Sequence, residues 1–401
     1  MAGYSARKTQ SEGASSRLYA KALALDDGSG RKAVLVTTDL LGLTGRVAGE
    51  IATEAQKRYG ISRDRLLLNS SHTHCGPVID DMLAVAYDLT PQQWRDIDEY
   101  TRELTAKIIG AIGGALKQMR PVTLTFGHGI TDFAANRRLA LNPNGPVDHD
   151  VPFLRVSDSG GKAVALVFGY ACHNTTIGAE HCKFDGDYAG YAQAALQDRN
   201  PGAIAFFVMG CGADANPKPR GALEQAQQNG TKLADAVGSI SASSQPIRGP
   251  LRTAFGIAEL RFAEPPSKED LLKRLSDPNE FVRRHARLLL RTLARNGHLD
   301  PFYPDPIQIW SFGSDLTLIA MGGEVVVDYA LELKRKYGAE KLWVAGYSND
   351  VFGYVPSVRV LHEGGYEGGG AMMYYGRTGP FHESVEATIY SKIEELMKQV
   401  R

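Results

Sequence analysis

Hydrophobic positions along the chain form short apolar runs that alternate with longer amphipathic segments. The short runs predict buried strands, and they lie at 33–38, 65–69, 121–126, 152–156, 163–170, 203–208, 307–312, 316–321 and 341–347. Apolar residues at helical spacing predict helices at 46–58, 90–119, 187–199, 266–296 and 383–400, and a further helix that starts around Glu324. This alternation predicts an α/β fold with mixed β-sheets and flanking helices.

The composition is ordinary for a globular protein and narrows the class of ligand. The chain has 401 residues, with 43% hydrophobic and 22% charged residues, enough for one large domain or for two. Basic and acidic residues number 45 each, so the formal net charge is zero. This balance does not favour nucleic acid and fits a small or neutral substrate. Because no apolar run reaches about 18 residues, we expect no transmembrane segment.

Export and disulfide signals are also missing from the sequence. Residues 1–12 contain no apolar stretch of the kind found in a secretory signal. The cysteines at positions 75, 172, 182 and 211 are too few for a disulfide framework. They form no Cys-x-x-Cys pair, so we do not expect a cysteine-rich zinc site.

Candidate metal-binding residues are concentrated in the segment 69–77, which reads Asn-Ser-Ser-His-Thr-His-Cys-Gly-Pro and follows an apolar strand. In extended backbone, residues two apart point to the same face. We therefore expect His72 and His74 to project into one pocket, where two neutral imidazoles would suit zinc. Two ordinary polar histidines in a loop are the alternative.

Two further residues follow predicted strands. His173 comes soon after the apolar run 163–170, where a buried histidine needs a partner or a metal. A hydrogen-bonded core histidine is the alternative. Glu324 lies between an apolar strand and a predicted helix. It either stabilises the helix N-terminus or completes a His-His-Glu zinc site with an open position for water, whose pKa zinc would lower to about 7.

The loop 212–217 reads Gly-Ala-Asp-Ala-Asn-Pro and follows the strand predicted at 203–208. Asp214 could accept a hydrogen bond from a metal-binding histidine, and Asn216 could donate one to an oxyanion. The alternative is an Asx-type turn before Pro217.

These segments together resemble the neutral/alkaline non-lysosomal ceramidases. Residues 69–77 match the family pattern Asn-x-Ser-His-Thr-His-x-x-Pro. Further landmarks follow in family order at 1–4, 18–20, 136–137, 171–173, 186–191, 323–324 and 365–368. The resemblance implies a single ceramidase-like domain over residues 1–401, with two packed mixed β-sheets flanked by helices.

The resemblance also implies a set of site residues. One zinc ion per chain is expected, and its implied ligands are His72, His173, Glu324 and Tyr354. The implied catalytic or substrate-contacting residues are His74, Arg137, Asn216 and Tyr366. Among these, Tyr366 resembles a transition-state stabiliser, and Arg137 falls on a family arginine that could bind the carbonyl or oxyanion.

The activity implied is zinc-dependent hydrolysis of an amide bond in an N-acyl or ceramide-like lipid substrate. Family members are often secreted or membrane-associated, so a secreted or periplasmic location is expected by resemblance alone. An ester or lactone hydrolase using the same zinc is one alternative. A ligand-binding homologue without catalytic activity is another.

The sequence departs from the family at positions that bear on the substrate. Ceramide-cleaving members carry Gly-Asp-x-Ser-Pro-Asn, whereas residues 213–218 read Ala-Asp-Ala-Asn-Pro-Lys. Asn216 thus stands where the family has serine, and we expect direct attack by zinc-activated water without an acyl-enzyme. Residues 11–18 contain no histidine, and the C-terminal immunoglobulin-like domain has no counterpart. These departures weaken the prediction of ceramide itself and leave the zinc chemistry intact.

Overall fold

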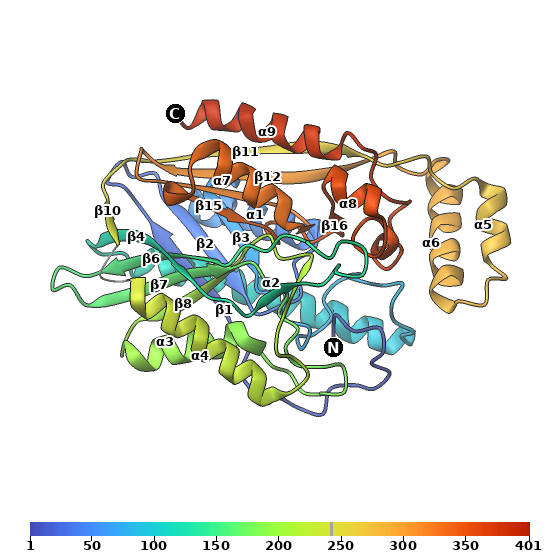
Figure 1. Cartoon of the computed structure of the whole chain (residues 1–401), viewed down its shortest axis with the longest axis horizontal. Coiled ribbons are helices and arrows are strands. Elements are labelled where there is room, and N and C mark those ends of the chain that lie inside the picture. Colours follow the sequence, from blue (N-terminus) through green and yellow to red (C-terminus); the bar gives the residue numbers. More distant parts are fainter. Residues whose placement is uncertain (241–243) are drawn as a thin grey trace.

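The computed structural model describes residues 1–240 and 244–401, and its strands form three mixed β-sheets of three to five strands (Figure 1). The three-stranded sheet contains β1 (Ala20–Leu25), β2 (Ala33–Thr38) and β3 (Leu66–Ser70). The five-stranded sheet has the order β10 (Gln245–Ile247), β4 (Thr123–Ile130), β6 (Asp150–Ser157), β7 (Ala163–Tyr170), β8 (Ile204–Met209). The four-stranded sheet has the order β11 (Leu251–Arg261), β12 (Phe302–Phe312), β13 (Leu316–Met321), β15 (Leu342–Ala345).

Each sheet combines parallel and antiparallel neighbours. The parallel pairs are β2 with β3, β7 with β8, and β13 with β15. Two short pairs complete the strands: β5 (Ala134–Asn136) lies antiparallel to β9 (Ala215–Pro217), and β14 (Glu324–Val325) lies parallel to β16 (Tyr354–Val355). These short pairs matter most for the site, because they join loops that are far apart in the sequence.

Helices cover the sheets on several sides (Figure 1). They are α1 (Gly45–Tyr59), α2 (Pro91–Lys117), α3 (Asp187–Arg199), α4 (Leu223–Ile240), α5 (Lys268–Arg274), α6 (Glu280–Asn296), α7 (Val327–Tyr337), α8 (Val358–Glu363) and α9 (Val385–Gln399). Short 3-10 turns lie at Arg63–Arg65, Ala339–Lys341 and Gly370–Met373. Thr90 caps α2 in a capping box with Gln93, and Pro91 takes the first helical position, as the sequence predicts.

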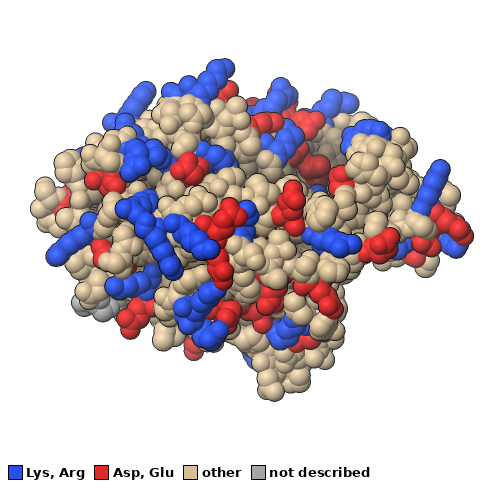
Figure 2. Space-filling view, turned by 90° about the horizontal axis from the view of Figure 1, so that it is seen from above, with Lys and Arg blue, Asp and Glu red and all other residues tan. Residues whose placement is uncertain are grey.

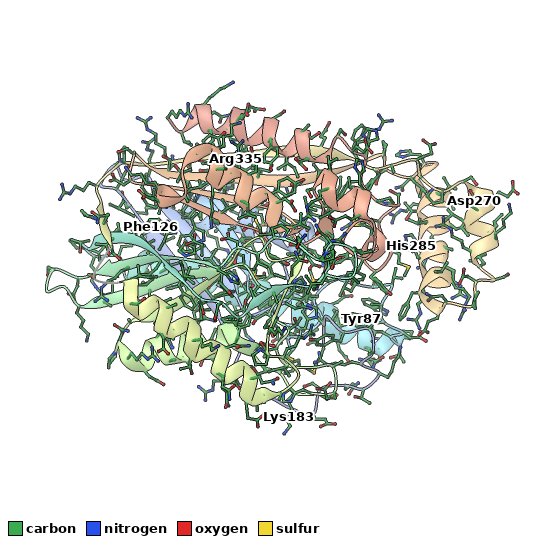
Figure 3. The ribbon with its side chains drawn as sticks, in the orientation of Figure 1. Tyr87, Phe126, Lys183, Asp270, His285 and Arg335 are labelled. Carbon is green, nitrogen blue, oxygen red and sulfur yellow. The ribbon has the colours of Figure 1, made fainter. Side chains whose placement is uncertain are left out.

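The core is an apolar cluster to which all three sheets contribute. Leu67 from β3, Phe206 from β8 and Trp310 from β12 are each at most 2% exposed within it. Burying one such side chain stabilises the fold by about 2 kcal/mol. Separate clusters lie beneath the helices, and the pair α5–α6 has a small core of its own around Leu271 and Leu289. Asp270 and His285 mark this pair at one end of the molecule (Figure 3).

The predicted α/β class with mixed sheets and flanking helices is confirmed, and two helix predictions need correction. The segment 266–296 is two helices, because the chain turns at Pro278 and Asn279 caps α6. The helix expected around Glu324 begins at Val327. Glu324 itself forms β14, because its N–H donates to the carbonyl oxygen of Gly353 at 2.8 Å and its backbone pairs with Tyr354.

Basic and acidic side chains are interspersed over the face seen in Figure 2, in keeping with the zero net charge. Within residues 1–240 and 244–401, none of the helices has an apolar stretch that would span a bilayer.

Candidate metal centre

The site is assembled from loops that follow the strands. His72 and His74 follow β3, and His173 follows β7. Glu324 opens β14 and Tyr354 opens β16, so the pairing of these two strands sets Glu324 directly beside Tyr354. The side chains of His72, His173 and Glu324 are at most 2% exposed, which places them below the surface.

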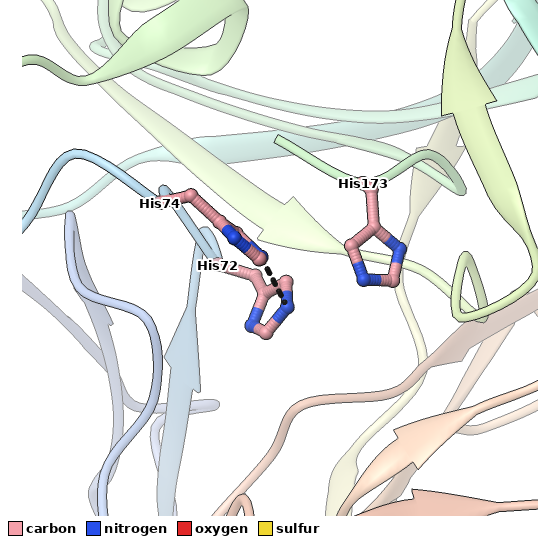
Figure 4. A group of neighbouring side chains, drawn as sticks. All are labelled: His72, His74 and His173. Carbon is pink, nitrogen blue, oxygen red and sulfur yellow. Dashed lines mark hydrogen bonds between the residues drawn. The ribbon is translucent and has the colours of Figure 1, made fainter. Parts of the chain in front are cut away.

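The imidazoles of His72, His74 and His173 converge on one point (Figure 4). Their metal-binding nitrogens all lie within 4.8 Å of one another, and Nε2 of His74 lies 3.1 Å from Nε2 of His72. The expectation that His72 and His74 share a pocket is therefore met, but the extended-backbone argument for it is wrong. β3 ends at Ser70, and His72 has a φ of 62°, so a turn brings the two rings together.

Hydrogen bonds fix the protonation of two of these rings. Nδ1 of His72 lies 2.6 Å from the carbonyl oxygen of Leu41, and Nδ1 of His173 lies 2.8 Å from that of Gly212. A carbonyl oxygen can only accept, so each Nδ1 carries a proton, and in the neutral form of each ring Nε2 offers its lone pair. Such carbonyl partners are typical of metal-binding histidines.

Both Nε2 lone pairs face the same carboxylate oxygen. Oε2 of Glu324 lies 3.1 Å from Nε2 of His72 and 3.1 Å from Nε2 of His173. Three acceptors with no proton between them repel one another unless a cation lies among them. Neutral imidazole nitrogen and carboxylate oxygen are preferred ligands of zinc. These residues therefore fit a zinc ion.

Burial and neighbouring charges favour the neutral form of His173 and His74, which is the form of imidazole that binds a metal. Burial, reinforced by Arg137, lowers the pKa of His173 to about 4, so this ring is neutral near pH 7. Burial also lowers the pKa of His74 well below its usual value, and His72 and His173 add to the effect.

Two tyrosines contact the carboxylate of Glu324, and sequence reasoning missed both. The hydroxyl of Tyr375 donates to Oε1 of Glu324, and that of Tyr347 lies 3.5 Å from Oε2. The Tyr347 ring also lies 4.5 Å from the His72 ring. Tyr375 leaves Oε2 as the oxygen that faces the imidazoles.

A cleft of about 260 Å³ opens above the buried ligands. The predicted catalytic residues His74, Arg137, Asn216 and Tyr366 all line it, together with Tyr354. Every site residue predicted from the sequence thus lies in this cleft or directly beneath it. The ligand and catalytic roles of these residues stay predictions.

Arg137 is held rigidly in the cleft wall. Its Nε donates to Oε1 of Glu367 at 2.6 Å, and its Nη2 donates to the hydroxyl of Tyr354 at 2.8 Å. The Tyr354 hydroxyl also lies 3.2 Å from Nε2 of His173. Sequence reasoning missed Glu367 as the partner of Arg137, because the two are 230 positions apart.

Asn216 reaches the cleft through the pairing of β5 with β9. Its side-chain oxygen accepts from the hydroxyl of Thr175 at 3.3 Å and lies 3.5 Å from Nη1 of Arg137. Asp214, which could have accepted from a metal-binding histidine, accepts instead from the backbone N–H of Val327 at 2.9 Å, at the start of α7. The carbonyl oxygen of Gly212 takes the bond from His173.

The fold and this site define a class: an α/β protein with a buried His-Glu centre suited to a metal and a polar cleft above it. The sequence model described as "Neutral/alkaline non-lysosomal ceramidase, N-terminal" matches residues 1–254. The chain belongs to this ceramidase family, and the resemblance seen in its motifs is confirmed.

Individual relatives are distant. Neutral ceramidase A of Dictyostelium discoideum is 26% identical over 244 residues, covering 55% of this chain and 34% of that protein. Neutral ceramidase of Pseudomonas aeruginosa is 23% identical over 232 residues, covering 54% and 34%. The aligned part is thus about a third of the length of each.

The fold is similar over almost the whole chain. The crystal structure of neutral ceramidase from Pseudomonas aeruginosa matches with a TM-score of 0.75 at 19% identity, covering 98% of this chain and 70% of that one. A structure described as ceramidase complexed with C2 matches with the same TM-score at 16% identity.

Proposed function

We propose that this chain is a zinc-dependent hydrolase that cleaves the amide bond of an N-acyl, lipid-like substrate. The observation that carries the proposal is the approach of two imidazole lone pairs and one carboxylate oxygen, His72, His173 and Glu324, at 3.1 Å beneath an open cleft. Membership of the ceramidase family supports the amide bond as the target.

His72, His173 and Glu324 would hold the zinc ion, with Tyr354 as a fourth ligand. His74 fits the ligand role less well, because its Nδ1 is buried without a hydrogen-bond partner, whereas metal-binding histidines almost always have one. We therefore assign His74 to substrate contact. When bound, zinc supplies Lewis-acid activation of the carbonyl group and of the attacking water.

The remaining chemistry falls to residues of the cleft wall. Arg137 faces the cleft with its geometry set by Glu367 and Tyr354, so it can bind the carbonyl oxygen as negative charge develops there. Tyr366, which is 46% exposed, and Asn216 offer further hydrogen bonds to the same oxygen. Water adds to the carbonyl carbon, the C–N bond breaks, and the amine leaves with a proton.

Asn216 offers no nucleophile for an acyl-enzyme. Intact-protein mass spectrometry during turnover should therefore show no acyl adduct. A covalent acyl adduct on the protein would contradict the proposal of direct water attack.

The first test is metal content by elemental analysis of the purified parent, His72→Ala and a matched control, His298→Ala. His298 is exposed at 66% and lies outside the site. We expect about one zinc per chain in the parent and the control, and none in His72→Ala. If none of the three proteins binds zinc even after loading, the proposal is wrong, and a ligand-binding role without catalysis is favoured instead.

Substrate class is tested on the zinc-loaded parent with N-acyl amides and matched esters of the same acyl chains. Faster hydrolysis of the amides, absent in His72→Ala, is the expected result. Hydrolysis of the esters alone would favour an esterase that uses the same site.

A further inference from the structure

A second cavity, of about 650 Å³, lies between the N-terminal segment and the first turns of α2. It shares no lining residue with the metal cleft. Much of its lining is apolar, including Leu18, Val78, Leu89, Ile97 and Phe184. Cavities of this size with mainly apolar walls and a few polar groups are typical of small-molecule sites.

Two aromatic side chains on the cavity wall are unusually exposed. Tyr19 is 48% exposed and Tyr100 is 37% exposed, and both line the cavity. Tyr100 lies on α2, and Tyr19 directly precedes β1. Exposed apolar surface in a concave region marks a binding site for an apolar group.

A basic side chain, Arg17, lines the cavity. Arg17 is exposed and has no ion pair or hydrogen bond in residues 1–240 and 244–401. Asp96, an acidic residue of the lining, accepts from Nε2 of Gln92 at 2.7 Å and forms no ion pair with Arg17. The cavity therefore suits a ligand with an apolar chain and an anionic head group.

We propose that this cavity binds a long-chain carboxylate, with the chain inside the cavity and the carboxylate at Arg17. Amide hydrolysis of an N-acyl substrate releases a carboxylate of this kind, so the choice of ligand rests on the proposed function. The polar walls of the metal cleft, with Arg137 and Asn216, suit the amide group instead.

The cavity is joined to the metal site by one loop. Val78 lines the cavity, whereas His74, four residues earlier, lines the metal cleft. The backbone N–H of Ala2 donates to the carbonyl oxygen of Gly76 at 2.8 Å, which ties the N-terminal segment to this loop. The chain of a long-chain carboxylate bound in this cavity would thus contact Val78, on the same loop as His74 of the metal cleft.

The test is a fluorescence titration of the zinc-loaded 401-residue chain with cis-parinaric acid, a fluorescent long-chain carboxylate. Ile97→Trp and Leu18→Trp each fill the cavity from a different wall and should weaken binding at least about tenfold, because the chain loses its apolar contacts. Arg17→Gln should weaken it about fivefold, the effect of one exposed ion pair. Arg31→Gln, an exposed arginine outside the cavity, should bind as the parent does.

The head group is tested by displacing the probe with a long-chain alcohol of the same length. The alcohol should bind the parent and Arg17→Gln equally, since it carries no charge. Circular dichroism and zinc content confirm that each variant is folded. If both tryptophan variants bind the probe as tightly as the parent does, the proposal is overturned.

His72→Ala separates this proposal from the proposed function. Retained probe binding in this variant supports a site distinct from the metal cleft. Loss of probe binding in His72→Ala with unchanged binding in Ile97→Trp would place the carboxylate in the cleft and refute the second site. A parent that binds the probe in the cavity but hydrolyses no amide would refute only the proposed function.

Discussion

Glu324 is the residue on which the metal centre depends most, because its two carboxylate oxygens have different partners. Oε2 faces the imidazoles, while Oε1 accepts from the hydroxyl of Tyr375. Within residues 1–240 and 244–401, the hydroxyl of Tyr375 forms no hydrogen bond with a histidine or with a residue that lines the cleft. Tyr375 is a positioning residue that selects which oxygen of Glu324 faces the imidazoles.

Tyr375→Phe removes this hydroxyl and leaves the ring in place. We expect zinc affinity to fall by roughly 10- to 100-fold, as is usual when a hydrogen bond to a metal ligand is lost. Competition with a zinc chelator measures this affinity without any substrate. Tyr374→Phe is the matched control, since its hydroxyl has no hydrogen bond in the described chain. Equal zinc affinity in both variants would refute the role of Tyr375.

Arg137→Lys tests carbonyl binding separately from zinc. Lysine keeps the charge but cannot hold Glu367 and Tyr354 in one rigid fork. We expect kcat for an N-acyl amide to fall by roughly 10²- to 10³-fold, the usual cost of losing an oxyanion contact, with about one zinc per chain retained. If activity falls only in proportion to the zinc that is lost, the role of Arg137 in carbonyl binding is contradicted.

At the scale of elements, the N-terminal segment forms one wall of the cleft. Gly3 has a φ of 97°, and a Cβ at this position would lie 2.5 Å from Cγ and Nδ1 of His74. The Tyr4 ring lies 4.8 Å from the His74 ring. A side chain at position 3 must therefore displace either the segment or His74.

Gly3→Ala should lower kcat/KM for an N-acyl amide by roughly 10- to 100-fold, because small displacements of substrate-contacting groups are costly. Zinc content should not change if His74 contacts substrate. Gly13→Ala is the control: it also has a positive φ, of 123°, but a Cβ there would meet nothing within 4 Å. Loss of zinc in Gly3→Ala alone would instead make His74 a metal ligand.

The elements predicted correctly from sequence are those whose signals are local. The strand at 163–170 and the helix at 187–199 have the bounds expected, because an unbroken apolar run and helical spacing lie within each. α4 and β11 were missed. β11 alternates buried and exposed positions only over Ile257–Arg261, where the apolar Ile257 takes an exposed position, and the half-buried Thr253, Phe255 and Gly256 break the pattern before it. β14 depends on Tyr354, which local patterns around Glu324 do not reveal.

The site residues also differ in whether a local sequence signal marks them. His72 and His173 could be predicted to lie at the site because each follows an apolar strand, and Tyr354 was predicted only through the family resemblance. The structure brings all three together, and their roles as ligands stay predictions. Tyr375 and Glu367 were missed because their partners are 51 and 230 positions away, and only the folded chain brings them together.

At the scale of the whole molecule, the site lies among loops that several sheets present together. The isolated bridge between Asn69 and Ser348 joins β3 to the segment after β15. The side-chain amide of Asn69 also donates to the carbonyl oxygen of Gly346 at 2.9 Å. These contacts link the candidate metal centre to the core, so the two are stabilised together. Buried carboxyl groups also lie near the contact between β3 and the segment after β15.

Asp350 is one of these groups and makes stability depend on pH. It is 6% exposed, and burial raises its pKa from 3.8 to about 6, although the hydroxyl of Tyr303 donates to its Oδ2 at 2.7 Å. Below pH 3.8 the carboxyl is protonated in both the folded and the unfolded chain. As the pH rises towards 6, the unfolded chain loses the proton first, so the free energy of unfolding falls.

Asp350→Asn keeps an acceptor for Tyr303 but removes this titration. Relative to the variant, the parent should lose on the order of 2 kcal/mol of unfolding free energy between pH 4 and pH 7, and the difference should be constant above pH 7. Denaturant unfolding of both zinc-free proteins at each pH measures it, and the metal ligands titrate alike in both, so their contribution cancels. A difference that does not change with pH would mean that Asp350 is already ionised in the folded chain at pH 4. The polar neighbours Tyr303 and Arg377 would then outweigh its burial.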